Sequence, residues 1–312
     1  MNTGNIQSQH LLGLKSLTRE EIESILAQAT VFKEVFNRSV KKLPTLNNKV
    51  FVSLFYENST RTRASFDMAI RMLGAGSINF SVQTSSVNKG ETLIDTVRNL
   101  ESLGIDGIIV RHPMGGVPAL IADHVKVPVI NAGDGFNEHP TQALLDLFTM
   151  IEEKGYIEGK KVAIIGDILH SRVARSNIWA LTKLGANVIV CGPPSLIPIG
   201  VENMGVTVTN KVEEAIEDAD FVNVLRVQFE RQKGNFFPST REYYREYGIT
   251  PQRLKRAKDD VIIMHPGPMN RGVEISTEVA DGPYNVILEQ VTNGVAVRMA
   301  VLYMLMSRKT TV

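Results

Sequence analysis

One stretch of this chain decides its fold: VFVSLFYENSTRTRASF, residues 50–66. It opens on an apolar run with β-branched side chains, which predicts a buried strand. A helical pattern follows, with apolar residues at i, i+3, i+4 and i+7 and a glycine to end it: Phe66, Ala69, Ile70, Leu73 and Gly74. Ser59 or Thr60 is the predicted N-cap, so the helix begins among hydroxyls and arginines. Backbone N–H groups, the helix dipole and guanidinium groups converge there, which predicts a site for a small phosphate-bearing ligand.

Strand and helix patterns alternate along the rest of the chain. Further strands are predicted at 77–80, 107–110, 128–131, 162–165, 188–190, 221–225 and 261–264. Further helices are predicted at 91–103, 118–125, from 139 onward, and at 171–184, 212–219, 251–257 and 285–306. This alternation predicts an α/β protein whose two domains each hold a parallel sheet flanked by helices on both faces. The polar segment 154–160 suggests domains at 1–150 and 151–285, with a last helix, 286–312, packing back toward the first.

The composition excludes several classes of protein. In 312 residues, 34 Lys and Arg balance 33 Asp and Glu, so no global field favours nucleic acid or an anionic membrane. The single cysteine, Cys191, rules out an intramolecular disulfide, and its apolar surroundings predict a small buried side chain rather than a catalytic thiol. A polar N-terminus predicts no secretory signal, and no apolar run approaches membrane-spanning length. We therefore expect a soluble cytoplasmic protein.

Basic residues follow several of the predicted strands. Besides the turn at 59–63, the clusters are Arg111-His112-Pro113, His139-Pro140-Thr141-Gln142, Gly166-Asp167 with Ser171-Arg172, Arg226-Val227-Gln228 and His265-Pro266-Gly267-Pro268. Each alone is more often an ion-paired or solvated group, but parallel sheets bind ligands at the carboxyl ends of their strands. The clusters lack grouped carboxylates, metal-ligand spacing and a nucleophile–base pair. They predict a cationic site, with no metal or cofactor, for direct group transfer from an activated phosphate donor to an anionic acceptor.

In this order and spacing the motifs resemble those of the carbamoyltransferase family, over nearly the whole chain. The matching motifs are Ser-Thr-Arg-Thr-Arg at 59–63, Lys89-Gly90-Glu91-Thr92, Arg111-His112-Pro113, Asp134-Gly135 with His139-Pro140-Thr141-Gln142, and His265-Pro266-x-Pro268. The family transfers the carbamoyl group of carbamoyl phosphate to an amino group and releases phosphate. The motifs are most similar to members whose acceptor is L-aspartate, which yields N-carbamoyl-L-aspartate for pyrimidine (UMP) synthesis. The resemblance implies that residues 1–150 bind carbamoyl phosphate and residues 151–285 bind aspartate.

The resemblance also implies roles for the matched residues. The phosphate cradle would be Ser59, Thr60, Arg61 and Thr62, with Arg111 as a further contact. The carbamoyl oxygen would be polarised by Thr62, Arg111 and His139. The carbamoyl NH₂ would be held by Gln142 and by the backbone at Pro266, Gly267 and Pro268. The two carboxylates of aspartate would be held by Arg172, Arg226 and Gln228.

The resemblance further implies shared active sites. Ser85 and Lys89 match a loop that reaches a neighbouring subunit, where Ser85 would contact carbamoyl phosphate and Lys89 would serve both aspartate binding and catalysis. A homotrimer is therefore expected. Higher assembly with regulatory chains or with dihydroorotase is left open.

Three other functions fit this sequence less well. A carbamoyltransferase acting on ornithine would carry a cysteine at position 266 and a Ser-Met-Gly loop, and this chain has neither. A non-catalytic protein that binds a phosphate metabolite would not need Thr62, Arg111, His139 and Gln142 together. A dehydrogenase would need a glycine-rich fingerprint, which residues 166–171 lack. The long polar segment 227–248 is either a surface loop or, as we favour, a lid over aspartate.

Overall fold

The computed structural model describes residues 6–81, 91–227 and 239–308. The chain divides into two compact units. Unit 1 comprises residues 1–148 and 291–312, and unit 2 comprises residues 149–290. Each unit is built on its own parallel sheet, so the predicted fold class is confirmed.

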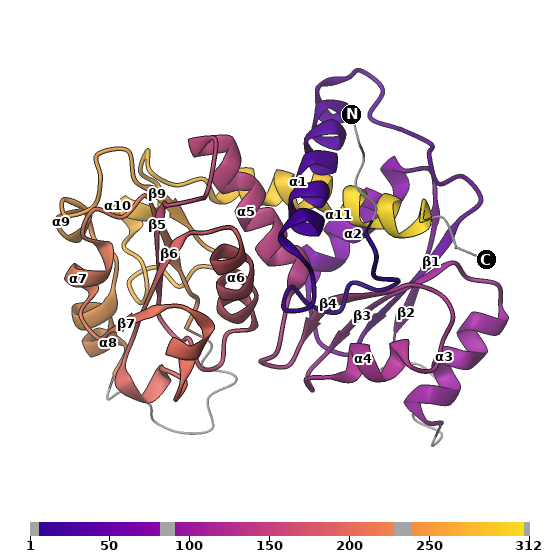
Figure 1. Ribbon diagram of the computed structural model, residues 1–312, viewed down its shortest axis with the longest axis horizontal. Coiled ribbons are helices and arrows are strands. Elements are labelled where there is room, and N and C mark those ends of the chain that lie inside the picture. Colours follow the sequence, from indigo (N-terminus) through magenta and orange to yellow (C-terminus); the bar gives the residue numbers. More distant parts are fainter. Residues whose placement is uncertain (1–5, 82–90, 228–238, 309–312) are drawn as a thin grey trace. The chain divides into compact units, whose positions relative to one another are not determined.

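Unit 1 holds a four-stranded sheet in the order β2-β1-β3-β4. The strands are β1 (Val50–Phe55), β2 (Gly76–Ser81), β3 (Gly107–His112) and β4 (Val129–Asp134). The helices are α1 (Arg19–Lys33), α2 (Thr60–Met72), α3 (Leu93–Ser102), α4 (Val117–Ala122), the start of α5 (Pro140–Lys154), most of α11 (Ile287–Met306) and the short 3₁₀ helix η1 (Glu34–Asn37). Helices α3 and α4 cover one face of the sheet, and α1, α2 and α11 cover the other (Figure 1).

The sheet of unit 1 is apolar on both faces because helices cover both. Val52 and Leu54 of β1 point to the side of α3 and α4, where they share one core cluster with Val97 and Ile121. The alternate residues of β1 are also buried, which is why the whole strand reads as an apolar run. Burial of each such side chain contributes about 2 kcal/mol to folding.

Unit 2 holds a five-stranded sheet in the order β7-β6-β5-β8-β9. The strands are β5 (Lys161–Ile165), β6 (Asn187–Cys191), β7 (Thr207–Thr209), β8 (Phe221–Val224) and β9 (Ile262–Met264). Helix α6 (Arg172–Lys183) lies on one face, and α7 (Val212–Ile216), α9 (Pro251–Leu254) and α10 (Thr277–Ala280) pack on the other, with α8 (Thr240–Tyr247) beside them (Figure 1). Two 3₁₀ helices, η4 (Pro194–Leu196) and η5 (Val201–Met204), follow β6.

Three α-helices, α1, α8 and α10, lie where none was predicted from the sequence. Helix α1 begins with a capping box in which the Glu21 backbone N–H donates to Thr18 Oγ1 (3.2 Å) and the Thr18 N–H donates to Glu21 Oε2 (2.9 Å). The prediction of one continuous loop over 227–248 is wrong in its second half, since α8 forms there with Ser239 as its N-cap. Residues 228–238 of that segment lie outside the described residues.

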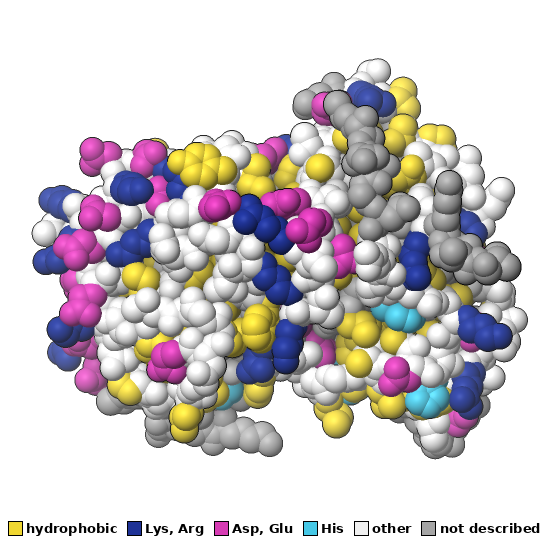
Figure 2. Space-filling model, in the orientation of Figure 1, with side chains coloured by type: hydrophobic (Ala, Val, Ile, Leu, Met, Phe, Trp, Pro, Cys, Tyr) yellow, Lys and Arg dark blue, Asp and Glu magenta, His cyan; other side chains and the backbone are white. Residues whose placement is uncertain are grey.

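Charges of both signs are mixed on part of the described surface. Acidic and basic side chains are interspersed over α7 and α9 (Figure 2), and Arg253 Nε pairs with Glu213 Oε1 there at 2.9 Å. Among the described helices, none combines the length and the apolar character that crossing a membrane requires. In the same described residues, no group of three or more His, Cys, Asp or Glu side chains is placed to hold a metal ion.

The single cysteine is expected to be inert in the folded protein. Cys191 is fully buried at the end of β6, and burial raises the pKa of its thiol to about 12. At pH 8 only about one thiol in 10⁴ is then ionised, and the thiolate is the reactive form. Titration with Ellman's reagent should detect no rapidly reacting thiol in the native protein and one per chain after unfolding in guanidinium. Stoichiometric modification of the native protein within seconds would contradict this burial.

Candidate active site

The order in which the chain adds strands to the sheet of unit 1 reverses between β1 and β3, which is the topological switch point of this sheet. From β1 the chain continues through α2 to β2 on one side, whereas β3 and β4 lie on the other side of β1. The connections after β1 and β3 therefore diverge and leave space between them at the carboxyl ends of the strands. The residues after β1 and the last residues of β3 occupy this switch point, and they include Ser59, Thr60 and Arg111.

The first turn of α2 leaves its backbone N–H groups open to an anion. Ser59 is the N-cap residue in extended conformation, yet its side chain makes no capping hydrogen bond, and the first turn carries no acidic residue. The orphan N–H groups and the helix dipole therefore favour a bound anion. Arg61 is exposed at this turn, whereas Thr62 is buried.

Arg111 joins this helix end to the neighbouring strands. Its Nη1 lies 3.5 Å from Thr62 Oγ1, a long contact, and donates to the Ala132 carbonyl of β4 at 3.2 Å. Its Nη2 pairs with Glu57 Oε1 at 3.1 Å. The guanidinium group is thereby fixed beside the first turn of α2. The structure thus brings together Thr62 and Arg111, which lie 49 residues apart in the sequence.

The connection from β4 to α5 is fixed by a buried carboxylate. Asp134 accepts hydrogen bonds at 2.8–3.0 Å from the backbone of Gly116 and Glu138 and from the side chains of Asn131 and Asn137. These bonds fix the turn that leads to His139, which is buried just before Pro140 opens α5. The imidazole is therefore held at the carboxyl edge of the sheet.

The residue before His139 is anchored by the N-terminal segment. Glu138 accepts hydrogen bonds from the backbone of Leu14 (2.6 Å) and Lys15 (3.2 Å). A Cβ atom at Gly13 would lie only 2.3 Å from Glu138 Oε1, so only glycine leaves room for this carboxylate. Distant parts of unit 1 therefore cooperate to hold His139.

Gln142 lies half-buried in the first turn of α5. Its Nε2 donates to Asp146 Oδ1 at 3.0 Å, one helical turn later. With the amide nitrogen engaged in this way, Oε1 is left to accept a hydrogen bond. This side-chain oxygen can accept a hydrogen bond from the NH₂ group of a ligand.

In unit 2 the strand order reverses between β5 and β8. After β5 the chain adds β6 and β7 on one side of β5, and it then adds β8 and β9 on the other side. Arg172, which is buried, opens α6 after β5, and half-buried Arg226 follows β8. The guanidinium groups of Arg172 and Arg226 therefore follow the two strands that flank the switch point. Because ligands bind at such a point and guanidinium groups pair with carboxylates, this arrangement favours a ligand that carries carboxylates.

The loop after β9 is held by the ring of His265. The Gly267 N–H donates to His265 Nδ1 (2.8 Å), so the ring proton lies on Nε2 and is donated to Glu274 Oε1 (3.1 Å). Both groups are buried, and the imidazole is occupied in shaping the backbone at 266–268. Gly267 has φ +62°, a conformation that other side chains rarely adopt.

The carboxylates that support the basic groups were not predicted from the sequence. The expectation that no carboxylates are grouped with the basic residues is wrong: Glu57 pairs with Arg111, Asp134 fixes the turn before His139, and Glu274 pairs with His265. The Asp134-Gly135 motif and the proximity of Glu57 to the 59–63 turn were the available signals. Three predicted site residues, Ser85, Lys89 and Gln228, lie outside the described residues.

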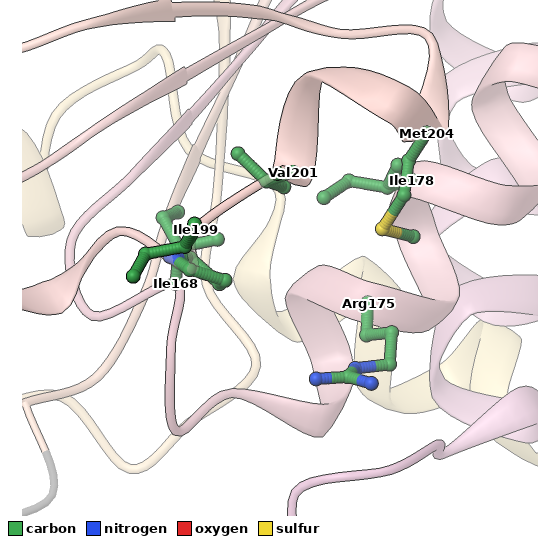
Figure 3. A pocket seen from close by; sticks show the side chains of 8 residues that line it. Ile168, Arg175, Ile178, Ile199, Val201 and Met204 are labelled. Carbon is green, nitrogen blue, oxygen red and sulfur yellow. The ribbon is translucent and has the colours of Figure 1, made fainter.

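A small cavity of unit 2 is lined by none of the predicted site residues. It has a volume of about 150 Å³ and is lined by Ile168, Arg175, Ile178, Pro198, Ile199, Gly200, Val201 and Met204, from α6, η5 and the loops beside them (Figure 3). The lining is apolar except for Arg175. It offers one guanidinium group and no cradle of donors, so we do not assign a phosphate to it.

Two family models match successive parts of this chain. Residues 9–152 match the model of the aspartate/ornithine carbamoyltransferase carbamoyl-P binding domain, and residues 158–305 match that of the Asp/Orn binding domain. Aspartate carbamoyltransferase catalytic subunits from Ruminiclostridium cellulolyticum and Moorella thermoacetica are 58% and 57% identical, covering 97% and 96% of this chain and 97% and 98% of the relatives.

Two solved structures share the fold over nearly their full length. Aspartate transcarbamoylase from Trypanosoma cruzi in complex with carbamoyl phosphate has a TM-score of 0.86 at 30% identity, covering 97% of this chain and 99% of that one. Ornithine carbamoyltransferase from Pyrococcus furiosus has a TM-score of 0.88 at 32% identity, covering 96% and 98%. The chain therefore belongs to the aspartate/ornithine carbamoyltransferase family.

Proposed function

We propose that this chain is the catalytic chain of an aspartate carbamoyltransferase. It transfers the carbamoyl group of carbamoyl phosphate to the amino group of L-aspartate and releases N-carbamoyl-L-aspartate and phosphate, a step of pyrimidine (UMP) synthesis. The observation that carries the proposal is the uncapped first turn of α2 with Arg111 fixed 3.5 Å from Thr62. The identity of 58% to a relative named for this activity supports the choice of acceptor.

Unit 1 binds carbamoyl phosphate in this proposal. The phosphate lies at the first turn of α2, against Ser59, Thr60, Arg61 and Thr62. Thr62, Arg111 and His139 polarise the carbamoyl oxygen, and the Oε1 atom of Gln142 accepts from the carbamoyl NH₂. By resemblance to the family, the backbone at Pro266, Gly267 and Pro268 and the side chain of Ser85 are assigned to carbamoyl phosphate as well.

The reaction needs charge stabilisation rather than a protein nucleophile. The unprotonated amino group of aspartate attacks the carbamoyl carbon, a C–N bond forms, and negative charge develops on the carbonyl oxygen. The C–O bond to phosphate then breaks, and the nitrogen loses one proton to the departing phosphate. Fixed donors such as Arg111 lower the barrier because they need not reorganise as the charge develops.

Unit 2 selects the acceptor. Arg172 and Arg226 offer guanidinium forks to the two carboxylates of aspartate, together with Gln228. Lys89, proposed to come from a neighbouring chain, adds a further positive charge. Ornithine would instead bring a cationic side chain toward these arginines, and like charges repel. The acceptor is therefore aspartate.

The assembly and the location are part of the same proposal. We propose a homotrimer with shared active sites, in which Ser85 and Lys89 serve a neighbouring chain. A cytoplasmic location is consistent with the free thiol of Cys191. Further association with regulatory chains or dihydroorotase can be tested by measuring the mass of the complex with each candidate added.

A product assay tests the function. Purified protein is incubated with carbamoyl phosphate and either L-aspartate or L-ornithine, and the products are separated by chromatography. We expect N-carbamoyl-L-aspartate with one phosphate released per turnover. Citrulline alone would assign the chain to the ornithine branch of the family. Binding of carbamoyl phosphate with no product from either amino acid would identify a non-catalytic binding protein.

A further inference from the structure

A buried arginine lies behind the proposed carbamoyl phosphate site of unit 1. Arg298 of α11 is 3% exposed, and its Nη1 donates to Ser65 Oγ of α2 and to the Gly294 carbonyl, both at 2.9 Å. Its guanidinium carbon lies 5.1 Å from the centre of the Phe66 ring. Since Ser65 and Phe66 follow the proposed phosphate cradle on the same helix, Arg298 ties α11 to α2 close to the ligand.

Gly294 allows three helices to meet at this arginine. A Cβ atom at this position would lie 2.5 Å from Arg298 Nη1, 3.1 Å from Leu145 Cδ2 on α5 and 3.7 Å from Ser65 Oγ on α2. The missing side chain therefore makes room for the guanidinium group where α2, α5 and α11 converge. A larger residue would displace Arg298 from Ser65.

The third helix carries the charge that balances Arg298. Burial lowers the pKa of Arg298 to about 10, and the negative charge of Asp146 on α5 opposes that shift, so the guanidinium group stays protonated at neutral pH. Asp146 is fully buried and also accepts from Gln142 Nε2 at 3.0 Å. Arg298 Nε finds no hydrogen-bond partner within the described part of the chain. A buried cation with this few partners is costly for stability alone, which favours a functional role.

We propose that Arg298 is a positioning residue for carbamoyl phosphate. Through Ser65 it fixes the rotation and height of α2, and its charge attracts Asp146, which accepts a hydrogen bond from Gln142 on α5. It thereby holds the spacing between the phosphate cradle and the group that receives the carbamoyl NH₂. The inference rests on the proposed function and extends it to residues that do not touch the substrate.

The alternative is that Arg298 only stabilises the fold. A stabilising residue would change the melting temperature but leave the kinetic constants of the folded enzyme unchanged. A positioning residue would raise the KM for carbamoyl phosphate and weaken the binding of inorganic phosphate. It would leave the KM for aspartate, measured at saturating carbamoyl phosphate, nearly unchanged. The two roles are therefore separable by experiment.

The test uses Arg298→Met, Arg298→Lys and Ser65→Ala, with Arg253→Met as the matched control. Arg253 is a partly buried arginine of unit 2 that contacts Glu213 and the carbonyls of Gly248 and Arg245, none of which is a proposed site residue. We expect Arg298→Met to raise the KM for carbamoyl phosphate about 10-fold or more and Arg298→Lys to recover part of the loss. Ser65→Ala should raise this KM about threefold.

Calorimetry with inorganic phosphate gives a readout that does not depend on turnover. Phosphate affinity should fall in the same order as the kinetic effects, and Arg253→Met should lower only the melting temperature. Ser65→Ala added to Arg298→Met should cause no further loss, because both changes remove the same contact. If Arg298→Met does not fold, Ser65→Ala still decides the question with Arg298 in place.

Failure of the proposed function and failure of the positioning role give different results. An unmutated protein that makes no carbamoyl-aspartate would defeat the proposed function itself. An active unmutated protein whose folded Arg298 and Ser65 variants keep the normal KM and phosphate affinity would overturn only the positioning role.

Discussion

Replacing Arg61 by methionine is expected to lower kcat/KM for carbamoyl phosphate by about 10³-fold. The substitution removes a charged donor from the first turn of α2, where the phosphate and its growing negative charge are stabilised. Because Arg61 is exposed in the folded chain, its loss should cost little stability. The rate of carbamoyl-aspartate formation at several concentrations of carbamoyl phosphate measures the effect.

Helix α2 supplies its own control for this experiment. Arg71 is an equally exposed arginine in the last turn of the same helix, away from the proposed cradle. Arg71→Met should retain the normal rate and a melting temperature close to that of Arg61→Met. If both variants kept normal kinetics, the phosphate could not lie at the start of α2, and the assignment of the cradle would be wrong.

The elements of this fold that carry strong local signals were predictable from the sequence. The strand β1 and the start of α2 were readable because an apolar run, an N-cap hydroxyl and a helical apolar pattern follow one another within one short stretch. The parallel sheets followed from the alternation of strands and helices. Helix α8 was not predicted, because its sequence is polar and only one of its faces, with Tyr243, is buried.

The supporting contacts of the site could not be read from the sequence. Arg298 and Ser65 are 233 residues apart and meet only because α11 returns to unit 1. Glu138 is held by Leu14 and Lys15 from more than 120 residues away. No spacing rule connects such residues, whereas the strand-end motifs of each unit lie at the carboxyl edge of that unit's own sheet by topology alone. The basic groups were therefore predictable, and the carboxylates and the buried arginine that fix them were not.

Mixing two inactive variants, Lys89→Ala and Arg61→Met, is expected to restore activity if active sites are shared between chains. Each variant alone has one lesion in every site. In randomly mixed trimers, about one quarter of the sites would combine an intact Arg61 with an intact Lys89 from the neighbouring chain. Activity after dissociation and reassociation should therefore rise to about a quarter of the unmutated value, because cyclic symmetry pairs each cradle with one neighbour.

The control for this mixing experiment pairs two lesions that belong to one chain's own cradle. Arg61 and His139 both lie in unit 1, at the connections after β1 and β4, so mixing Arg61→Met with His139→Ala should leave every site with a lesion and restore nothing. Mass spectrometry of intact trimers verifies that the chains have exchanged. Recovery in the control mixture, or none in the Lys89 mixture after verified exchange, would exclude shared sites of this arrangement. If one chain instead supplied both Lys89 and Arg61 to its own site, every site in either mixture would carry a lesion. Neither mixture would then regain activity, so the comparison of the two mixtures separates shared sites from sites made by a single chain.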